Sequence, residues 1–252
     1  MSERQLPPLG VALVGSNAIS VVAELVAATQ GYEDFVAIRR RGNSTNLPVI
    51  MDSDAWNDEI LRRPGYFKAH EKIQELDDLI TKLVGGRRFD CFIHISKDIF
   101  CQMLESHPLC DRYFYLEEGI TSMLGKRFGK ARTRKLQPFI WKWRSRLFYR
   151  NRFNIFHPHF VTDSPKYGGS FAISEAAFPG FPNRKLLSLE DLPSGEALQQ
   201  DVVVFLDAHY YNKDIEEEYK QALKECLGSL IDKPSTVAVK FHPRDTDPVR
   251  HE

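Results

Sequence analysis

The sequence has little cysteine, and the cysteines form no pattern that predicts a metal site or a disulfide framework. Cys91, Cys101, Cys110 and Cys226 include no Cys-x-x-Cys pair and have no histidine at metal-ligand spacing. Three of them lie on or beside apolar runs, so we expect buried free thiols in a reducing compartment. We therefore expect no zinc site and no metal cofactor.

The chain also lacks a long apolar run and an excess of charge of one sign. No stretch approaches the roughly 18 uncharged apolar residues that a membrane-spanning helix requires, and the polar N-terminus has no apolar signal-peptide core. The 34 Lys and Arg residues balance the 34 Asp and Glu residues, so the net charge gives no argument for nucleic acid or acidic partners. These features predict a cytoplasmic globular protein.

Strand-like apolar runs alternate with helical spacing along the first part of the chain. The expected strands are residues 10–15, 35–38, 89–95 and 112–116, and the expected helices are residues 18–29, 70–84 and 97–105. This alternation predicts an α/β fold with a doubly wound parallel sheet. Residues 43–66 predict a loop with at most a short helix. The first strand–turn–helix lacks Gly-x-Gly-x-x-Gly and gives little support for a dinucleotide site.

The remaining sequence predicts a second α/β domain. Residues 160–163, 171–173 and 185–189 are expected to be short strands or turns, which completes a first domain over residues 1–190. Residues 191–200 read as a linker. Residues 201–252 then give strand 201–206, helix 215–230 and strand 236–241. Because two parallel strands cannot cover their own faces, we expect this second domain to be truncated.

Residues 119–162 contain no acidic side chain, although the whole chain is neutral. The cations there are Lys126, Arg127, Lys130, Arg132, Arg134, Lys135, Lys142, Arg144, Arg146, Arg150 and Arg152, and the interleaved aromatic residues are Phe139, Trp141, Trp143, Phe148, Tyr149 and Phe153. This composition suits an anionic membrane surface on the inner face of the membrane or an anionic acceptor, and suits nucleic acid less well. The alternative is a solvated basic helix whose aromatic side chains pack inward.

Two short motifs follow predicted strands and carry groups suited to chemistry. Glu117, Glu118 and Gly119 follow an aromatic strand, at the edge where parallel sheets place their active sites; alone, the two glutamates read as solvated turn residues. His242 and Pro243 follow the last predicted strand. Lys240 and Arg244 flank His242, and such a cluster suits a phosphate group.

Together the acidic–acidic–glycine motif and the His-Pro motif resemble those of the bacterial sialyltransferases that modify lipooligosaccharide or build capsule polysialic acid. The resemblance implies a GT-B fold with two Rossmann-like domains, and an inverting, metal-independent transfer of sialic acid from CMP-sialic acid to a sugar hydroxyl. It makes Glu118 the general base, with Glu117 as second candidate. It assigns donor binding to Gly119, Lys240, His242, Pro243 and Arg244, and His242 also neutralises the departing phosphate. The family's later Ser/Thr motif would lie beyond Glu252.

Two other interpretations remain open from the sequence. A Lys-x-His-Pro strand end also resembles that of the teichoic-acid polyol-phosphate transferases, which would imply a CDP-polyol donor. The third interpretation is a non-catalytic fragment that binds a membrane surface or nucleic acid through the basic segment 126–152.

Overall fold

The structure is a computed structural model that describes residues 9–40, 42–54, 56, 65–124, 137–155, 157–191, 202–205 and 237–240. The chain divides into two compact units, Met1–Leu192 and Pro193–Glu252. Within the described ranges, no helix is both long enough and apolar enough to cross a membrane.

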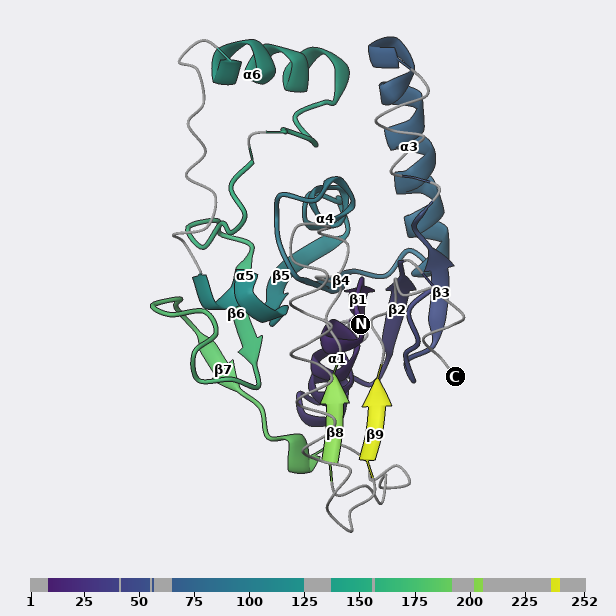
Figure 1. The fold of residues 1–252 in the computed structure, drawn as a ribbon. Coiled ribbons are helices and arrows are strands. Elements are labelled where there is room, and N and C mark those ends of the chain that lie inside the picture. The colour runs from purple at the N-terminus through teal and green to yellow at the C-terminus, as the bar shows by residue number, and fades with distance from the viewer. Residues whose placement is uncertain are drawn as a thin grey trace, which may run out of the picture. The chain divides into compact units, whose positions relative to one another are not determined.

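The first unit is an α/β structure in which strands and helices alternate (Figure 1). Its strands are β1 (Leu9–Val14), β2 (Phe35–Arg39), β3 (Val49–Asp52), β4 (Phe89–Ile93), β5 (Cys110–Leu116), β6 (Tyr167–Ala172) and β7 (Arg184–Leu186). Its helices are α1 (Asn17–Thr29), α3 (Gly65–Leu83), α4 (Ile99–Glu105), α5 (Gly119–Leu124), α6 (Gln137–Phe148) and the 3-10 turn η2 (Leu189–Asp191). This confirms the predicted α/β class.

The seven strands form one sheet in the order β3-β2-β1-β4-β5-β6-β7, and every neighbouring pair is parallel. The order runs outward in both directions from β1 and β4, as in a doubly wound Rossmann-like sheet. The connections that leave β1 and β4 diverge to opposite sides at this switch point. Ligands of such sheets bind beyond the carboxyl ends of the strands there.

One face of the sheet is covered by α1. Ser16 caps this helix: its Oγ accepts a hydrogen bond of 3.4 Å from the backbone N of Ile19, which satisfies a donor that the first turn leaves unpaired. The buried residues of the helix are Ile19, Ser20, Val22, Ala23, Leu25 and Val26. The apolar ones pack with Phe92 and Phe114 of the central strands. The predicted helix over residues 18–29 is confirmed.

Helices α3 and α4 pack on the opposite face. The residues of α3 that enter this core are Ala69, Ile73, Leu76 and Ile80, all buried and spaced three or four apart. That spacing places them on one side of the helix, and burying each large aliphatic side chain contributes about 2 kcal/mol. The helix extends five residues before the predicted start at residue 70, because its first turn lies ahead of the apolar repeat.

The prediction of a loop over residues 43–66 is wrong for Val49–Asp52, which forms β3 at the edge of the sheet. The strand pairs with β2, and Arg39 of β2 holds Asp52 through two hydrogen bonds of 2.7 and 2.9 Å. A four-residue edge strand with partly exposed side chains lacks both the length and the apolar run that mark the buried strands.

The second unit contains the parallel pair β8 (Val202–Phe205) and β9 (Val237–Lys240), in which Phe205 pairs with Lys240. Both strands lie within the predicted ranges 201–206 and 236–241. The predicted helix over residues 215–230 lies outside the described residues. The GT-B arrangement of two domains stays a prediction.

The prediction of buried free thiols is confirmed for three of the four cysteines. Cys91, Cys101 and Cys110 are all buried and free, and Cys226 lies outside the described residues.

Candidate active site

Polar side chains gather at the carboxyl edge of the sheet, around the switch point between β1 and β4. Gly15 and Ser16 follow β1, His94 follows β4, and Glu117 and Glu118 follow β5. Because β4 lies between β1 and β5, the sheet brings His94 between the other two loops. We refer to His94, Glu117 and Glu118 as the carboxyl-edge site.

Glu117 is held by the backbone of the neighbouring loop. Its Oε2 accepts hydrogen bonds from the backbone N of Ile173 at 2.7 Å and of Ser174 at 2.9 Å, and its own backbone N donates to the carbonyl of Phe171 at 3.1 Å. The carboxylate therefore fastens the turn after β6 to the end of β5. Two backbone amides thus occupy Oε2 of Glu117.

Glu118 has the opposite environment. Its side chain is 33% exposed, and its Oε2 lies 3.8 Å from Nε2 of the nearly buried His94. Its backbone N donates a 2.7 Å hydrogen bond to Oγ of Ser122 in the first turn of α5. The backbone is thus fixed, while the carboxylate reaches solvent beside an imidazole. At 3.8 Å the pair is longer than a hydrogen bond, so the carboxylate keeps its capacity to accept one.

The third residue of the motif, Gly119, has a backbone conformation that favours glycine. Its φ is +52°, in the left-handed region, which costs a residue with a Cβ roughly 1–2 kcal/mol. This turn separates β5 from α5 and lets the Ser122 hydroxyl reach back to the amide of Glu118. The acidic–acidic–glycine sequence therefore encodes one fixed carboxylate, one accessible carboxylate and the turn that parts strand from helix.

His94 is supported from below by Cys101 of α4, whose Sγ lies 4.0 Å from its Nδ1. Burial raises the pKa of the Cys101 thiol well above its usual value, so the thiol keeps its proton. The other ring nitrogen of His94, Nε2, faces the carboxylate of Glu118.

A mostly buried ion pair sets the position of α4 and therefore of Cys101. Arg40 Nη1 lies 2.5 Å from Asp98 Oδ2, and the two side chains are 18% and 14% exposed. The other oxygen of Asp98 accepts from the amides of Phe100 and Cys101 at 2.9 and 3.3 Å, so Asp98 is also the N-cap of α4. The Arg40 backbone donates to Val14 of β1, which ties α4 to the switch point.

The structure brings together some of the predicted site residues and leaves others undescribed. Glu117, Glu118 and Gly119 lie at one loop as predicted. Lys240 is described only as the last residue of β9 in the second unit. The predicted donor-binding residues His242, Pro243 and Arg244 lie outside the described residues, so their roles stay predictions.

The sequence pattern does not single out His94, because the residue reads as part of the predicted strand 89–95. One feature of the sequence could have indicated His94: it is the first polar residue after the buried strand β4, which ends at Ile93. Its partner Glu118 is 24 positions downstream, and only the pairing of β4 with β5 brings them together.

Within the basic segment 126–152, Arg152 does not contribute to a basic surface, and its prediction as part of one is wrong. Its side chain is 13% exposed and pairs with Asp77 of α3 at 2.5 and 2.9 Å. It also donates to the carbonyl of Met103 at 2.7 Å. Lys126 lies outside the described residues.

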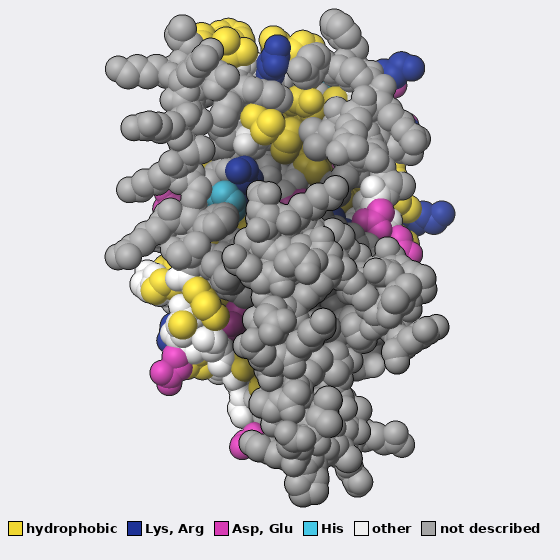
Figure 2. Space-filling model, viewed as in Figure 1, with side chains coloured by type: hydrophobic (Ala, Val, Ile, Leu, Met, Phe, Trp, Pro, Cys, Tyr) yellow, Lys and Arg dark blue, Asp and Glu magenta, His cyan; other side chains and the backbone are white. Residues whose placement is uncertain are grey.

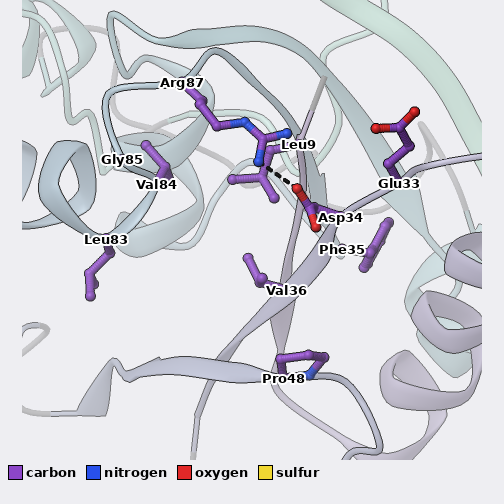
Figure 3. Close-up of a pocket in the computed structure, with 10 residues that line it drawn as sticks. All are labelled: Leu9, Glu33, Asp34, Phe35, Val36, Pro48, Leu83, Val84, Gly85 and Arg87. Carbon is purple, nitrogen blue, oxygen red and sulfur yellow. Dashed lines mark hydrogen bonds and ion pairs between the residues drawn. The ribbon is translucent and has the colours of Figure 1, made fainter. Parts of the chain in front are cut away.

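A pocket of about 570 Å³ opens at the opposite edge of the sheet, where β1 and β2 begin (Figure 3). Figure 3 shows Arg87 reaching Asp34 at its rim, with Nη1 2.5 Å from Oδ2. Leu83 and Val84, at the end of α3, form one wall. Parallel α/β sheets bind their ligands beyond the carboxyl ends of the strands, and this pocket lies at the amino ends. We therefore take the carboxyl-edge site, and not this pocket, as the candidate site.

The two glutamates should differ in their effect on stability. We expect Glu117→Ala to lower the free energy of unfolding by about 2 kcal/mol, because the amides of Ile173 and Ser174 lose a charged acceptor. Glu118→Ala should change the free energy of unfolding by less than about 0.5 kcal/mol, because the Glu118 side chain is a third exposed and its loss leaves no backbone amide of Ile173 or Ser174 without an acceptor. Urea unfolding of both variants measures the difference. Equal destabilisation would contradict the separate roles.

Comparison with models of known protein families gives no match, and comparison with curated proteins gives none. The resemblance to sialyltransferases therefore rests on residues 117–119 and 242–243.

Proposed function

We propose that the protein is a glycosyltransferase in which Glu118 removes the proton from an acceptor hydroxyl. The observation that supports this most is the contrast at the carboxyl-edge site: Glu117 is bound by two backbone amides, whereas Glu118 is accessible and faces His94. A general base needs an accessible lone pair within reach of its substrate. We assign this role to Glu118, because its carboxylate is a third exposed and faces His94.

The proposed reaction is a direct displacement at the anomeric carbon of the donor sugar. The acceptor oxygen forms a bond to that carbon as its proton passes to Glu118, and the bond from the carbon to the phosphate oxygen breaks. The nucleotide leaves with the electron pair of that bond, and the anomeric configuration inverts. His94 lies beside the carboxylate, with Nε2 3.8 Å from Oε2 of Glu118, and its other ring nitrogen contacts Cys101.

The donor assignment follows the motif resemblance, which implies CMP-sialic acid and a sugar hydroxyl on lipooligosaccharide or capsule glycan. In that assignment His242, with Lys240 and Arg244, holds the donor phosphate and stabilises its developing charge. Preorganised charge of this kind contributes about 3 kcal/mol or more to lowering a barrier. No metal ion has a part in the proposed reaction.

The test of the proposed function compares two nucleotide donors on the full chain. We expect release of CMP from CMP-sialic acid, accompanied by labelled sialic acid on an oligosaccharide acceptor, at a rate that excess EDTA leaves unchanged. CDP-glycerol should give no transfer. Turnover of CDP-glycerol without turnover of CMP-sialic acid would instead assign the protein to polyol-phosphate transfer. Turnover of neither donor by the complete protein, with its whole donor domain, would contradict the enzyme proposal.

A further inference from the structure

Helix α6 exposes a continuous apolar face. Phe139, Ile140, Trp143 and Leu147 are 62%, 50%, 52% and 59% exposed. At 3.6 residues per turn these four positions fall within an arc of about 100°. The rings of Phe139 and Trp143 also contact each other edge to face, with centroids 6.4 Å apart. Four large side chains on one side of a twelve-residue helix are more than scattered surface apolar residues, and patches of this kind mark interaction sites.

The opposite side of the helix is fixed to the first unit. Ser145 and Tyr149 are buried, and Tyr149 packs edge to face on Phe153 at 5.3 Å. Just beyond the helix, Arg150 donates to Nδ1 of His70 at 3.0 Å and to Oε1 of Gln74 at 2.9 Å, both on α3. The apolar face therefore points outward, because the opposite side of the helix and the residues that follow it contact the rest of the unit.

Cations flank the apolar face, and acidic residues are absent from the segment. Lys142 and Arg146 are exposed and lie beside one border of the apolar arc by helical geometry, while Arg144 lies at the other border. The sequence contains no acidic residue from 119 to 162. Figure 2 shows hydrophobic side chains and a basic side chain together at the end of the molecule where Figure 1 places α6.

We propose that α6 docks the protein onto an anionic lipid bilayer, lying parallel to the surface with its apolar face among the headgroups and acyl chains. An interfacial helix has this pattern: aromatic and aliphatic residues on one side, cations at their borders. Nucleic acid fits less well, because it offers stacking partners for Phe139 and Trp143 but no apolar volume for Ile140 and Leu147. A second copy of the helix would bring like charges together.

The structure confirms one part of the sequence-based prediction for the aromatic residues of this segment and contradicts another. The prediction that the aromatic side chains of a basic helix pack inward holds for Tyr149 and Phe153, which are buried, and is wrong for Phe139 and Trp143. The exposed pair belongs to the lipid-facing side, and the buried pair anchors the chain that follows the helix.

Vesicle co-flotation of the full chain tests this proposal. We expect binding to phosphatidylcholine vesicles that contain about 30% phosphatidylglycerol, at least tenfold weaker binding to pure phosphatidylcholine, and weakening with added salt. The double substitution Phe139→Gln/Trp143→Gln should weaken binding at least tenfold, by removing the aromatic anchors. Lys142→Gln/Arg146→Gln should weaken binding to the anionic vesicles about 25-fold, because each cation near the surface contributes about fivefold.

Matched controls come from exposed residues outside α6. Leu186→Gln/Leu189→Gln removes two exposed apolar side chains, and Lys68→Gln/Lys82→Gln removes two exposed charges from α3; both should bind as the parent chain does. The proposal is overturned if the α6 variants bind vesicles as well as these controls. It is also overturned if the α6 substitutions abolish oligonucleotide binding but not vesicle binding, or if gel filtration gives a dimer that Phe139→Gln/Trp143→Gln dissociates.

Discussion

Glu118→Gln is expected to lower the turnover of CMP-sialic acid by about 100- to 10,000-fold, the usual contribution of a general base. The amide has nearly the shape of the carboxylate, so it keeps the position opposite His94 but cannot accept the proton of the acceptor hydroxyl. The backbone N–H of residue 118 still donates to Oγ of Ser122, so the loop and α5 remain in place. The loss should appear in kcat, with KM for the donor changed little.

Steady-state kinetics with labelled donor measure this prediction, and two variants serve as controls. Glu175→Gln changes an exposed carboxylate in the loop after β6 and should leave kcat unchanged. Glu118→Ala should lose at least as much activity as Glu118→Gln, while both unfold at the same urea concentration as the parent chain. Unchanged turnover in Glu118→Gln would refute the assignment of the base. A comparable loss in Glu175→Gln would point to the charge of the loop instead.

The central strands β4 and β5 were predictable because they are buried on both faces, whereas only Phe171 and Ala172 of β6 fall within a predicted strand or turn. Residues 89–93 and 112–116 read as strands because nearly every side chain in them is apolar, which a central parallel strand requires. The edge strand Val49–Asp52 could not be found in this way. Its residues are half exposed, and its position depends on pairing with β2 and on the contact between Arg39 and Asp52, which no local pattern encodes.

The candidate site was predictable only in its local part. The adjacent residues Glu117, Glu118 and Gly119 predict a turn with two carboxylates. The difference between the two carboxylates depends on contacts of Glu117 with Ile173 and Ser174, more than 50 positions away. His94 belongs to the site through the strand order alone. Sequence periodicity reports which side of an element is buried, and it does not report which loops meet at an edge of the sheet.

A further network shows how far such non-local contacts reach. Glu105, the last residue of α4, accepts a 2.7 Å hydrogen bond from Oγ of Ser96, and that hydroxyl lies 2.6 Å from the buried hydroxyl of Tyr115. The other oxygen of Glu105 lies 3.7 Å from Nε2 of His157. A pocket of about 360 Å³ borders Glu105, with Lys166 also in its wall.

Burial raises the pKa of the Glu105 carboxyl to about 7, while the hydrogen bond from Ser96 and the charge of Lys166 act in the opposite direction. Burial lowers the pKa of His157, so that imidazole is neutral where Glu105 ionises. The ammonium of Lys166 donates to the carbonyls of Glu105 and His107 at 3.5 and 3.4 Å, and burial outweighs its charge in setting the pKa of Glu105. The ionised form of Glu105 therefore lowers the stability of the folded state.

The sign of the pH dependence follows from proton binding. Between pH 4.5, the ordinary pKa of the carboxyl, and about pH 7, the unfolded chain has lost a proton that the folded chain keeps. The free energy of unfolding contributed by Glu105 therefore falls as pH rises through this window. A shift of this size corresponds to about 3 kcal/mol, fully present below the window and lost above it.

Glu105→Gln should stabilise the protein by about 3 kcal/mol near pH 8 and by almost nothing near pH 4.5. The Gln carbonyl can still accept the hydroxyl of Ser96, and the amide has no proton to lose in this range. Urea unfolding of the parent chain and the variant at several pH values measures the difference, in which titration of all other groups cancels. Glu175→Gln, an exposed change of the same chemistry, should give a difference near zero throughout. A stability difference for Glu105→Gln that stays constant from pH 4.5 to 8, or grows toward acid, would show that folding does not raise the pKa of Glu105.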